Sequence, residues 1–313
     1  MSRLSGPCLK CLQHLSSQDD VDGTGLHAKC FTDWFKLKGR ASFGSFERRQ
    51  SGSLGPAVPM QGDVAGWNTS FFHGRFKKYS ATLADQSYIF KVKEDIAPEL
   101  PDVEYLCNQI AKSCGLPVPP FYMVKFGGER AFVTKNFIRK NAGAVNLVHI
   151  YHYLDPDGRY DCAALLKSIL HETRRHADAA VFVSTCLYDS IIGNHDRHGR
   201  NLGLLVTTKG TMLAPIYDNT SALGLEYGEF LRADWSPKGK IATSTTPEPT
   251  AKDYVVEFRR LGYEAEVTKF AQRLNVNRIA AIIGGSFCSE LMKDAMKRLF
   301  IKRIDEIAHE LAA

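Results

Sequence analysis

The stretch IIGNHDRHGRNLGLLVTTKGTMLAPIYDNTS, residues 191–221, gathers charged, histidine and amide side chains between apolar runs. A polar loop with Asp196 and Asn201 is followed by two strand-like segments, which are joined by a Lys-Gly turn and end at Asp218. Such a hairpin would bring Asn201 and Asp218 to the same end. Carboxylates and an amide suit a divalent cation bound to phosphate oxygens. The stretch therefore predicts a cation site at one end of a hairpin.

Length and composition indicate an ordinary globular protein. With 313 residues, 44% hydrophobic and 24% charged, the chain can form two lobes around separate cores. The net charge of +6 fits a nucleotide or an acidic partner but not a clustered nucleic-acid surface, so we expect no direct nucleic-acid binding. Residues 1–10 hold no apolar signal region, and no run approaches the roughly 18 apolar residues of a membrane span. We therefore expect a cytoplasmic protein without membrane contact.

The cysteines fall into two groups. Five of the eight are scattered through apolar patterns, which is typical of buried thiols in a reducing compartment. The other three lie near the N-terminus in Cys8-Leu-Lys-Cys11 and His27-Ala-Lys-Cys30, a pattern that resembles a Cys3His zinc knuckle. The alternative is that these reduced side chains simply pack in a small cap. We assign residues 1–45 to a small Cys/His-containing module and residues 46–66, rich in Gly, Ser, Pro and Arg, to a linker.

Residues 67–139 predict a small lobe of antiparallel strands with one helix. The pattern of Ser87–Lys93 alternates, so that Tyr88 and Phe90 share one face of a strand while Lys91 shares the other with the apolar Ile89. Lys91 is either a lysine at a strand edge or a phosphate contact under a glycine-containing loop.

A helix is expected over about 100–114, with Asp102 as a plausible cap and Glu104 in the first turn. Glu104 either interacts with the helix dipole or orients Lys91. Two further strands, 121–126 and 131–136, would complete the sheet.

Residues 140–313 predict a larger helical lobe, which makes the fold class α+β. Helices are expected near 145–154, over about 161–176 and over 178–192, and again after 252. The histidines of HETRRH, residues 171–176, are five apart and cannot hold one ion from a helix, so we assign them to a solvated face.

Five residues occur in the order that phosphoryl transfer requires: Lys91, Glu104, Asp196, Asn201 and Asp218. The Asp-x4-Asn spacing of Asp196 and Asn201 matches a kinase catalytic loop, and Asp218 follows where a second metal-binding acid belongs.

From about residue 70 to its end, the chain resembles the HipA-like serine/threonine kinases, which include the toxin kinases of bacterial toxin-antitoxin operons. The segments that carry the resemblance are GRFKKYSATL with YIFKV, ELPDVEYLCNQIAKSCGLPVPP, RAFVTKNFIR, and IIGNHDRHGRNLG with APIYDNTSALG.

The resemblance implies a bilobed protein-kinase-like fold with ATP between the lobes, and an ATP- and Mg-dependent kinase that phosphorylates a translation-related protein and itself. Lys91 would be the phosphate lysine with Glu104 as its partner, Asp196 the catalytic base, and Asn201 and Asp218 the Mg ligands. The hinge that meets adenine would be Lys135 to Phe137. The full set of implied cofactor contacts is Gly74, Lys78, Lys91, Lys135, Asn136, Phe137, His198, Asn201 and Asp218.

Two departures from the family pattern bear on regulation and partners. The family's loop places Ser-Ile-Ser before the glycine, whereas this chain has Phe71-Phe72-His73 before Gly74; the substitute candidates for autophosphorylation are Thr69, Ser70 and Ser80. The chain also resembles the short, HipT-like form that lacks an N-terminal subdomain, which implies a small subunit that supplies it, besides a HipB-like antitoxin.

Three alternatives stay open. Asp196-Arg197-His198 followed by Asn201 also resembles the catalytic loop of phosphoinositide lipid kinases. His195-Asp196 could be the HD dipeptide of metal phosphohydrolases, with further ligands from His149, His152 and His171. A nucleotide-binding pseudokinase is the third alternative, although the presence of all five residues argues against it.

Overall fold

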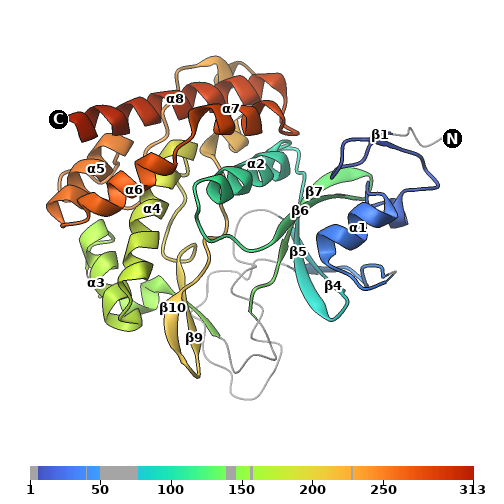
Figure 1. Cartoon of the computed structure of the whole chain (residues 1–313), viewed down its shortest axis with the longest axis horizontal. Helices are drawn as coiled ribbons and strands as arrows, with labels where there is room; N and C mark the ends of the chain where they lie inside the picture. Colours follow the sequence, from blue (N-terminus) through green and yellow to red (C-terminus); the bar gives the residue numbers. More distant parts are fainter. Residues whose placement is uncertain (1–5, 40, 50–76, 139–145, 156–157, 227) are drawn as a thin grey trace. The chain divides into compact units, whose positions relative to one another are not determined.

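The computed structural model describes residues 6–39, 41–49, 77–138, 146–155, 158–226 and 228–313. The chain forms two compact units, which are coloured along the sequence in Figure 1. Unit 1 contains Met1–Tyr105 and Pro119–Phe137, and unit 2 contains Leu106–Val118 and Ile138–Ala313. The predicted domain boundaries, 1–45, 46–66, 67–139 and 140–313, stay predictions.

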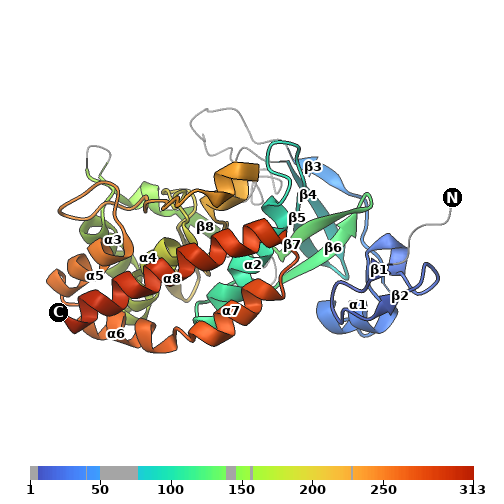
Figure 2. The ribbon, with the colours of Figure 1, turned by 90° about the horizontal axis from the view of Figure 1, so that it is seen from above.

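Unit 1 is built on a five-stranded antiparallel sheet (Figure 2). Its strands are, in spatial order, β3 (Glu47–Arg49), β4 (Lys78–Leu83), β5 (Gln86–Val92), β7 (Glu129–Lys135) and β6 (Phe121–Phe126). The turn between β4 and β5 contains Ala84 and Asp85, both with positive φ, as a tight two-residue hairpin turn requires.

The helix α2 (Leu100–Ser113) begins in unit 1 and continues into unit 2. Asp102 is not its cap, because the helix has already begun at Leu100. The buried carboxylate of Asp102 instead accepts two hydrogen bonds from Arg130 of β7, at 2.6 and 2.7 Å. This bidentate pair attaches the first turn of α2 to the sheet.

An N-terminal module of residues 6–35 also belongs to unit 1. It consists of the short strands β1 (Gly6–Pro7) and β2 (His14–Leu15), a 3-10 turn at Val21–Gly23, and helix α1 (Ala28–Phe35). The backbone N–H of Lys125 in β6 donates to Thr24 O at 2.7 Å, which attaches the module to the edge of the sheet.

Aromatic packing buries the face of the sheet opposite Lys91. Phe35 of α1 lies 4.3 Å from Tyr122 and 5.4 Å from Tyr88 between ring centroids, and Phe43 lies 5.0 Å from Phe90. Residues 47–49, which fall within the predicted linker, form edge strand β3, because the aromatic side chains just before them anchor this segment on the sheet. Residues 50–66 lie outside the described residues.

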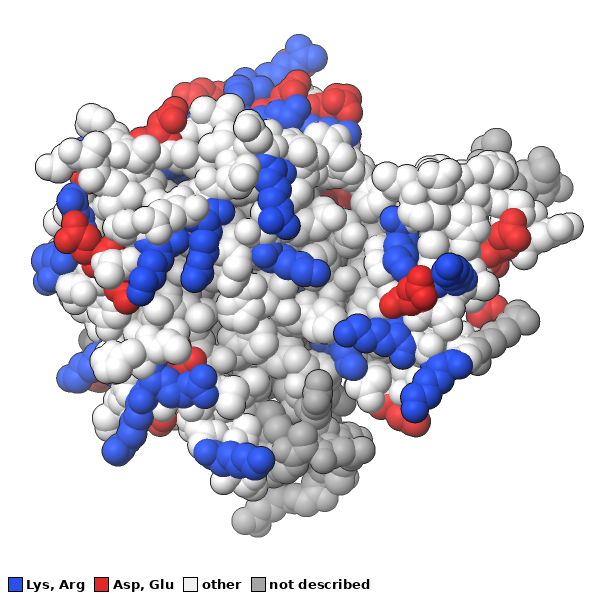
Figure 3. Space-filling view, viewed as in Figure 1, with Lys and Arg blue, Asp and Glu red and all other residues white. Residues whose placement is uncertain are grey.

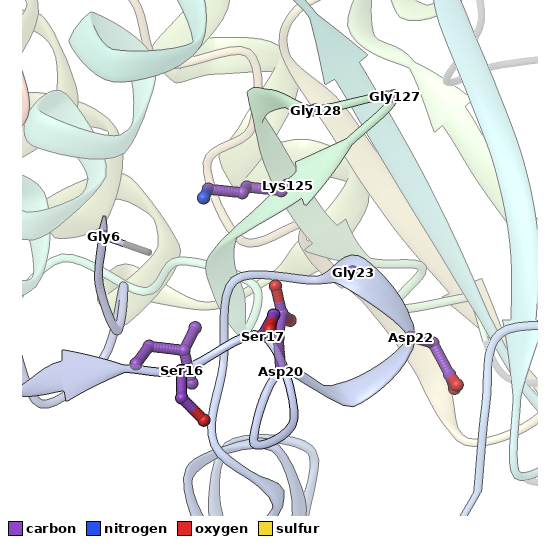
Figure 4. Close-up of a pocket in the computed structure, with 10 residues that line it drawn as sticks. Gly6, Ser16, Ser17, Asp20, Asp22, Gly23, Lys125, Gly127 and Gly128 are labelled. Atoms are coloured by element: carbon purple, nitrogen blue, oxygen red, sulfur yellow. The ribbon is translucent and has the colours of Figure 1, made fainter. Parts of the chain in front are cut away.

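A pocket of about 660 Å³ opens between the module and the β6–β7 turn. In Figure 4, Lys125 and Asp20 project into this space from opposite walls. The two glycines of the turn, Gly127 and Gly128, have φ values of 63° and 90°, which glycine adopts without strain.

Unit 2 is mainly helical and is organised around α4 (His176–Ile192), whose last turns are completely buried. The other helices are α3 (Cys162–Thr173), α5 (Ala251–Arg260), α6 (Glu264–Arg273), α7 (Val276–Gly284) and α8 (Glu290–Ala312), with 3-10 turns at Ile150–Tyr153, Ala222–Leu225 and Gly228–Arg232. The long helix α8 packs against α4, α5 and α7 (Figures 1 and 2).

A three-stranded antiparallel sheet in unit 2 contains the predicted hairpin, formed by β9 (Gly203–Thr207) and β10 (Gly210–Leu213). Its third strand is β8 (Asn146–His149), so the helix predicted near 145–154 is wrong for these residues, whereas Ile150–Tyr153 form a 3-10 turn. Pairing of β8 with β9, which places the buried Leu147 opposite Leu205, prevails over the local helical pattern.

No helix among the described residues is both long and apolar enough to cross a membrane.

Candidate active site

Lys91 and Glu104 form the ion pair that the sequence suggested. Lys91 lies on β5, and its Nζ is 2.5 Å from Glu104 Oε1 in the first turns of α2. The two side chains are only 10% and 3% exposed. Strand alternation explains the arrangement, since the neighbouring Tyr88 and Phe90 point to the opposite, aromatic face. The pair holds a lysine ammonium in a fixed position on the α2 side of the sheet.

A second lysine lies beside the first. Lys78 of β4 is directly opposite Lys91 in the antiparallel register and is also buried. Directly opposite residues share a face with Cβ atoms about 4.5–5.5 Å apart. Two ammonium-bearing side chains on one face are unfavourable by themselves, and a polyphosphate would stabilise them.

The predicted hinge lies at the end of β7. Lys135 N–H donates to Pro120 O at 2.8 Å, and Asn136 N–H donates to Ser87 O at 2.9 Å. Neither N–H can therefore donate a hydrogen bond to adenine while the sheet is intact. The predicted contacts with adenine are thus limited to the other backbone groups of Lys135, Asn136 and Phe137. Gly74 and the Phe71-Phe72-His73 segment lie outside the described residues.

The predicted catalytic loop follows α4, whose C-terminal cap is Gly193 in the left-handed conformation. Asp196 projects outward with its side chain 62% exposed, and His198 Nε2 lies 3.7 Å from its Oδ1. The Nδ2 of the buried Asn201 donates to the backbone carbonyl of Asp196 at 2.8 Å. This bond fixes the amide so that Oδ1 is the atom presented as a possible metal ligand.

The residue that organises this loop, Arg197, was not predicted from the sequence. Arg197 is 1% exposed and makes a bidentate pair with Asp189 of α4, at 2.7 and 2.9 Å. It also donates to the backbone oxygens of Asn201 at 3.0 Å and Tyr217 at 2.7 Å, and to Asn219 Oδ1 at 2.8 Å. One guanidinium thus joins the predicted catalytic loop to both neighbours of Asp218.

Electrostatics keep this guanidinium charged. Complete burial by itself would lower the pKa of Arg197, but the attraction and hydrogen bonds of the Asp189 carboxylate raise the pKa above its ordinary value. A signal for this pair was present in the sequence, because Asp189 is a charged residue within an otherwise apolar helical run and so requires a buried partner.

Asp218 follows the hairpin, as predicted, with φ of 51°. This left-handed conformation is uncommon for residues other than glycine, although Asp and Asn tolerate it best. Asn219 continues the network by donating to Asn108 Oδ1 of α2 at 3.0 Å. Arg197 and Asn219 therefore tether the backbone on both sides of Asp218.

The candidate phosphorylation sites and the HETRRH histidines differ in accessibility. Ser80 is buried in β4 and is inaccessible to a kinase while the sheet is folded, and Thr69 and Ser70 lie outside the described residues. The HETRRH histidines are not on one helix, since α3 ends at Thr173 and α4 begins at His176, and the side chain of His171 is 79% exposed, as predicted.

The HD phosphohydrolase alternative loses support. It requires histidines gathered around Asp196, but His149 lies in β8 with Nδ1 3.3 Å from the hydroxyl of Tyr217. Within the described part of the chain, the convergent His, Cys and acidic ligand groups comprise a single cluster, and that cluster does not include Asp196.

The convergent cluster is the predicted one: Cys8, Cys11, His27 and Cys30, whose ligand atoms all lie within 4.8 Å of one another. Burial opposes ionisation of Cys8, but hydrogen bonds from the backbone of Cys11, His27 and Lys10 lower its thiol pKa to about 6. Burial and the neighbouring thiols raise the pKa of Cys30 to about 12. The predicted Cys/His cluster is thus present.

Figure 3 shows the charges on one face of the molecule. Lys and Arg side chains are spread over the described part of this face, separated mostly by uncharged side chains, with fewer Asp and Glu among them. The expectation of no direct nucleic-acid binding stays a prediction.

Comparison with known proteins identifies relatives of the chain. The family model described as the HipA-like C-terminal domain matches residues 67–300. The protein "Putative kinase Y4dM" of Sinorhizobium fredii (strain NBRC 101917 / NGR234) is 28% identical over 180 residues, which cover 52% of this chain and 44% of that protein. "Putative kinase Y4mE" of the same organism is 25% identical over 143 residues, which cover 40% of this chain and 33% of that protein. The match spans less than half the length of both relatives.

Solved structures share the fold. The proinflammatory kinase CtkA of Helicobacter pylori superposes with a TM-score of 0.63 at 18% identity, covering 75% of this chain and 93% of that chain. A chain of the Shewanella oneidensis MR-1 toxin-antitoxin complex of HipA, HipB and operator DNA superposes with a TM-score of 0.55 at 17% identity. The match covers 72% of this chain and 60% of that chain. At these identities the likeness concerns the fold alone. The predicted protein-kinase-like, HipA-like fold is confirmed.

Proposed function

This chain belongs to the family of the HipA-like C-terminal domain, and from that premise we propose that it is an ATP- and Mg-dependent kinase of protein serine and threonine residues. The observation that carries the proposal is the buried Lys91–Glu104 ion pair, at 2.5 Å, on the strand and helix where a kinase holds its phosphate lysine. ATP and magnesium are the cofactors of this proposal. The zinc predicted from the cysteine pairs belongs to the N-terminal module and takes no part in it.

The residues of the catalytic loop fit a magnesium ion. Magnesium prefers hard oxygen ligands, which the Asp218 carboxylate and the oriented Oδ1 of Asn201 supply. When bound, the ion would neutralise charge on the phosphate oxygens during transfer. Arg197 would keep the two ligands in register, because it bonds to the backbone of Asn201 and of Tyr217, next to Asp218.

The remaining residues would act on the phosphates and the nucleophile. Lys91, held by Glu104, would bind phosphate oxygens, and Lys78 would add a second cation from the same face. Asp196 would orient the substrate hydroxyl and accept its proton while that oxygen attacks the γ-phosphorus and the bond to ADP breaks. The 62% exposure of the Asp196 side chain suits a hydroxyl presented by another protein.

The test is transfer of labelled phosphate from ATP to protein in a cell lysate and to the chain itself. We expect Asp196→Asn and Asp218→Asn to lower transfer by at least about a hundredfold, since each removes a group used in the transition state. The matched control is Asp305→Asn, an exposed aspartate of α8. Equal transfer by the wild type and both active-site variants would refute the assignment.

The two lysines before and within β4 offer a second comparison. Lys78→Ala should raise the KM for ATP by about tenfold, the effect of losing one charge-assisted contact of about 1.4 kcal/mol. Lys77→Ala, which removes an exposed neighbour, should leave the KM unchanged. Equal effects of the two changes would contradict the role of Lys78.

The alternatives give different results in the same assay. ATP binding without transfer would indicate a pseudokinase, and release of phosphate without transfer to protein would indicate a hydrolase. Labelling of phosphatidylinositol vesicles but not of protein would indicate a lipid kinase.

We propose a translation-related protein as the substrate and a HipB-like antitoxin as the partner. The partner proposal draws on the solved complex, in which HipA occurs with HipB and operator DNA. Co-purification of the chain with the product of a neighbouring antitoxin-like gene would test it, and a chain that elutes alone after co-expression would count against it.

A further inference from the structure

We propose that Cys8, Cys11, His27 and Cys30 bind one structural zinc ion, and that this ion holds the N-terminal module of residues 6–35 against the five-stranded sheet. The site goes beyond the proposed kinase function and does not depend on it. Its four ligands come from two short segments, the turn between β1 and β2 and the residues that open α1.

The spacing of the ligand atoms suits a tetrahedral ion. Zinc bonds to sulfur at about 2.3 Å and to nitrogen at about 2.0 Å, so ligand atoms around one ion lie about 3.5–3.8 Å apart. The Nδ1 of His27 is 3.5 Å from Cys11 Sγ and 4.0 Å from Cys30 Sγ, and all four ligand atoms lie within 4.8 Å. Small movements of the side chains would therefore complete the coordination.

The histidine is oriented for metal binding. The Nε2 of His27 lies 2.9 Å from the backbone oxygen of His14, and a carbonyl can only accept, so Nε2 carries the proton. In the neutral ring the lone pair is then on Nδ1, which faces the thiols of Cys11 and Cys30. Ligating histidines commonly donate their other N–H to a carbonyl in this way.

Backbone geometry in the first cysteine turn gives an independent indication. Leu12, directly after Cys11, has φ of 62° and its side chain is exposed. Its N–H donates to Cys8 O at 2.9 Å, and Cys8 N–H donates to Gln13 O at 2.8 Å, which closes a tight turn around the two sulfurs. An exposed leucine in the left-handed region is costly, and such strain is retained where the turn serves a site.

The set of four ligands specifies the kind of site. Three thiolates and one imidazole fill a tetrahedral zinc shell and leave no position open for water, as in structural rather than catalytic sites. All cysteines are free thiols in this structure, so no disulfide takes the place of the metal.

The module needs such a link because its own core is small. Segments of fewer than about 40 residues rarely fold without a metal, a disulfide or a partner surface. The module buries Leu9, Leu15, Leu26, Phe31 and Phe35. Because α1 begins at Ala28, ligation of His27 and Cys30 would fix its first turn and thereby aim the phenylalanines of α1 at the aromatic face of the sheet.

The experiment measures metal content, which is independent of kinase activity. Chains purified without added zinc should contain about one zinc ion each by mass spectrometry of the element. Cys11→Ser, a change at an exposed ligand, should abolish it, whereas Cys114→Ala, a change at a buried cysteine of unit 2, should retain it. After replacement of zinc by cobalt, the spectrum should show tetrahedral ligand-field bands and thiolate charge transfer.

Hydrogen exchange tests the structural role. Removal of zinc by a chelator should accelerate amide exchange in α1 and at Lys125, and it should leave α4 protected. A folded wild type without zinc that gives no tetrahedral cobalt spectrum would overturn the site. Loss of zinc without faster exchange in α1 would overturn its role in holding the module.

Discussion

Two buried cations, Lys91 and Arg197, are central to the proposed active site, and each is paired with one carboxylate. Lys91 is paired with Glu104 at 2.5 Å, whereas Arg197 uses its whole guanidinium toward Asp189 and three further groups. This difference suits their proposed tasks. A lysine ammonium is a compact charge that suits contact with a phosphate, whereas the planar guanidinium of the arginine can hold several groups of the loop at once.

The Lys91–Glu104 pair gives a prediction about stability. Lys91→Met and Glu104→Gln should each lower the free energy of unfolding by about 3–5 kcal/mol, because each leaves the other charge buried without this partner. The double variant should lose less than the sum of the two single losses. Urea unfolding measures all three, with the exposed Lys77→Met as the control. Losses that simply add would mean that the two groups do not interact.

The conformation of Asp218 gives a second prediction. The φ of Asp218 is 51°. Asp218→Asn should therefore unfold at nearly the wild-type urea concentration. Asp218→Ala should have a free energy of unfolding about 1 kcal/mol lower than Asp218→Asn, because alanine tolerates the left-handed region less well. Asp305→Ala, in helix α8, should show no such loss. Equal free energies of unfolding for Asp218→Ala and Asp218→Asn would show that the backbone at position 218 is not strained.

At the scale of single residues, the residue types and their order in the sequence predicted most of the candidate site. Lys91, Glu104, Asp196, Asn201 and Asp218 could be selected because phosphoryl transfer limits the choice of groups. The role of Arg197 could be predicted only in part. Asp189 marks the need for a buried partner, but the hydrogen bonds of Arg197 to the backbone oxygens of Asn201 and Tyr217 leave no mark on a sequence.

At the scale of elements, the turn between β4 and β5 offers a way to raise stability. Ala84 and Asp85 have φ of 47° and 60°, a conformation in which Asn-Gly is preferred. Replacing them by Ala84→Asn and Asp85→Gly should raise the free energy of unfolding by about 1 kcal/mol. Thermal unfolding measures the gain. Gly128→Ala, at φ of 90° in the β6–β7 turn, should have the opposite effect.

Strands were predictable where the local hydrophobic pattern favoured the same structure as the strand's partner in the folded chain. The β9–β10 hairpin and the alternating faces of β5 follow from short-range periodicity. Strand β8 was predicted as helix because its residues fit both patterns, and only the distant β9 decides between them. Strand β3 was hidden in a polar, glycine-rich segment, since the aromatic contacts that hold it lie about 40 residues further along the sequence.

At the scale of the whole molecule, nucleotide binding should appear as added stability. A ligand present at a hundred times its Kd stabilises the folded state by about 2.7 kcal/mol, so Mg-ATP should raise the Tm of the wild type. Lys91→Met should lose most of this shift, whereas Lys77→Ala should keep it. An equal shift in both variants would show that ATP binds without Lys91.

Arg197 also bears on how active and inactive relatives can be told apart. Its hydrogen bonds to Asp189, to the backbone of Asn201 and Tyr217 and to Asn219 hold the loop together. A descendant that lost phosphoryl transfer would still need Arg197, Asp189 and Asn219 to fold, so selection for folding alone would preserve them. Genome surveys that score catalytic competence should therefore weigh Asp196 and Asp218, and treat the arginine as a marker of ancestry.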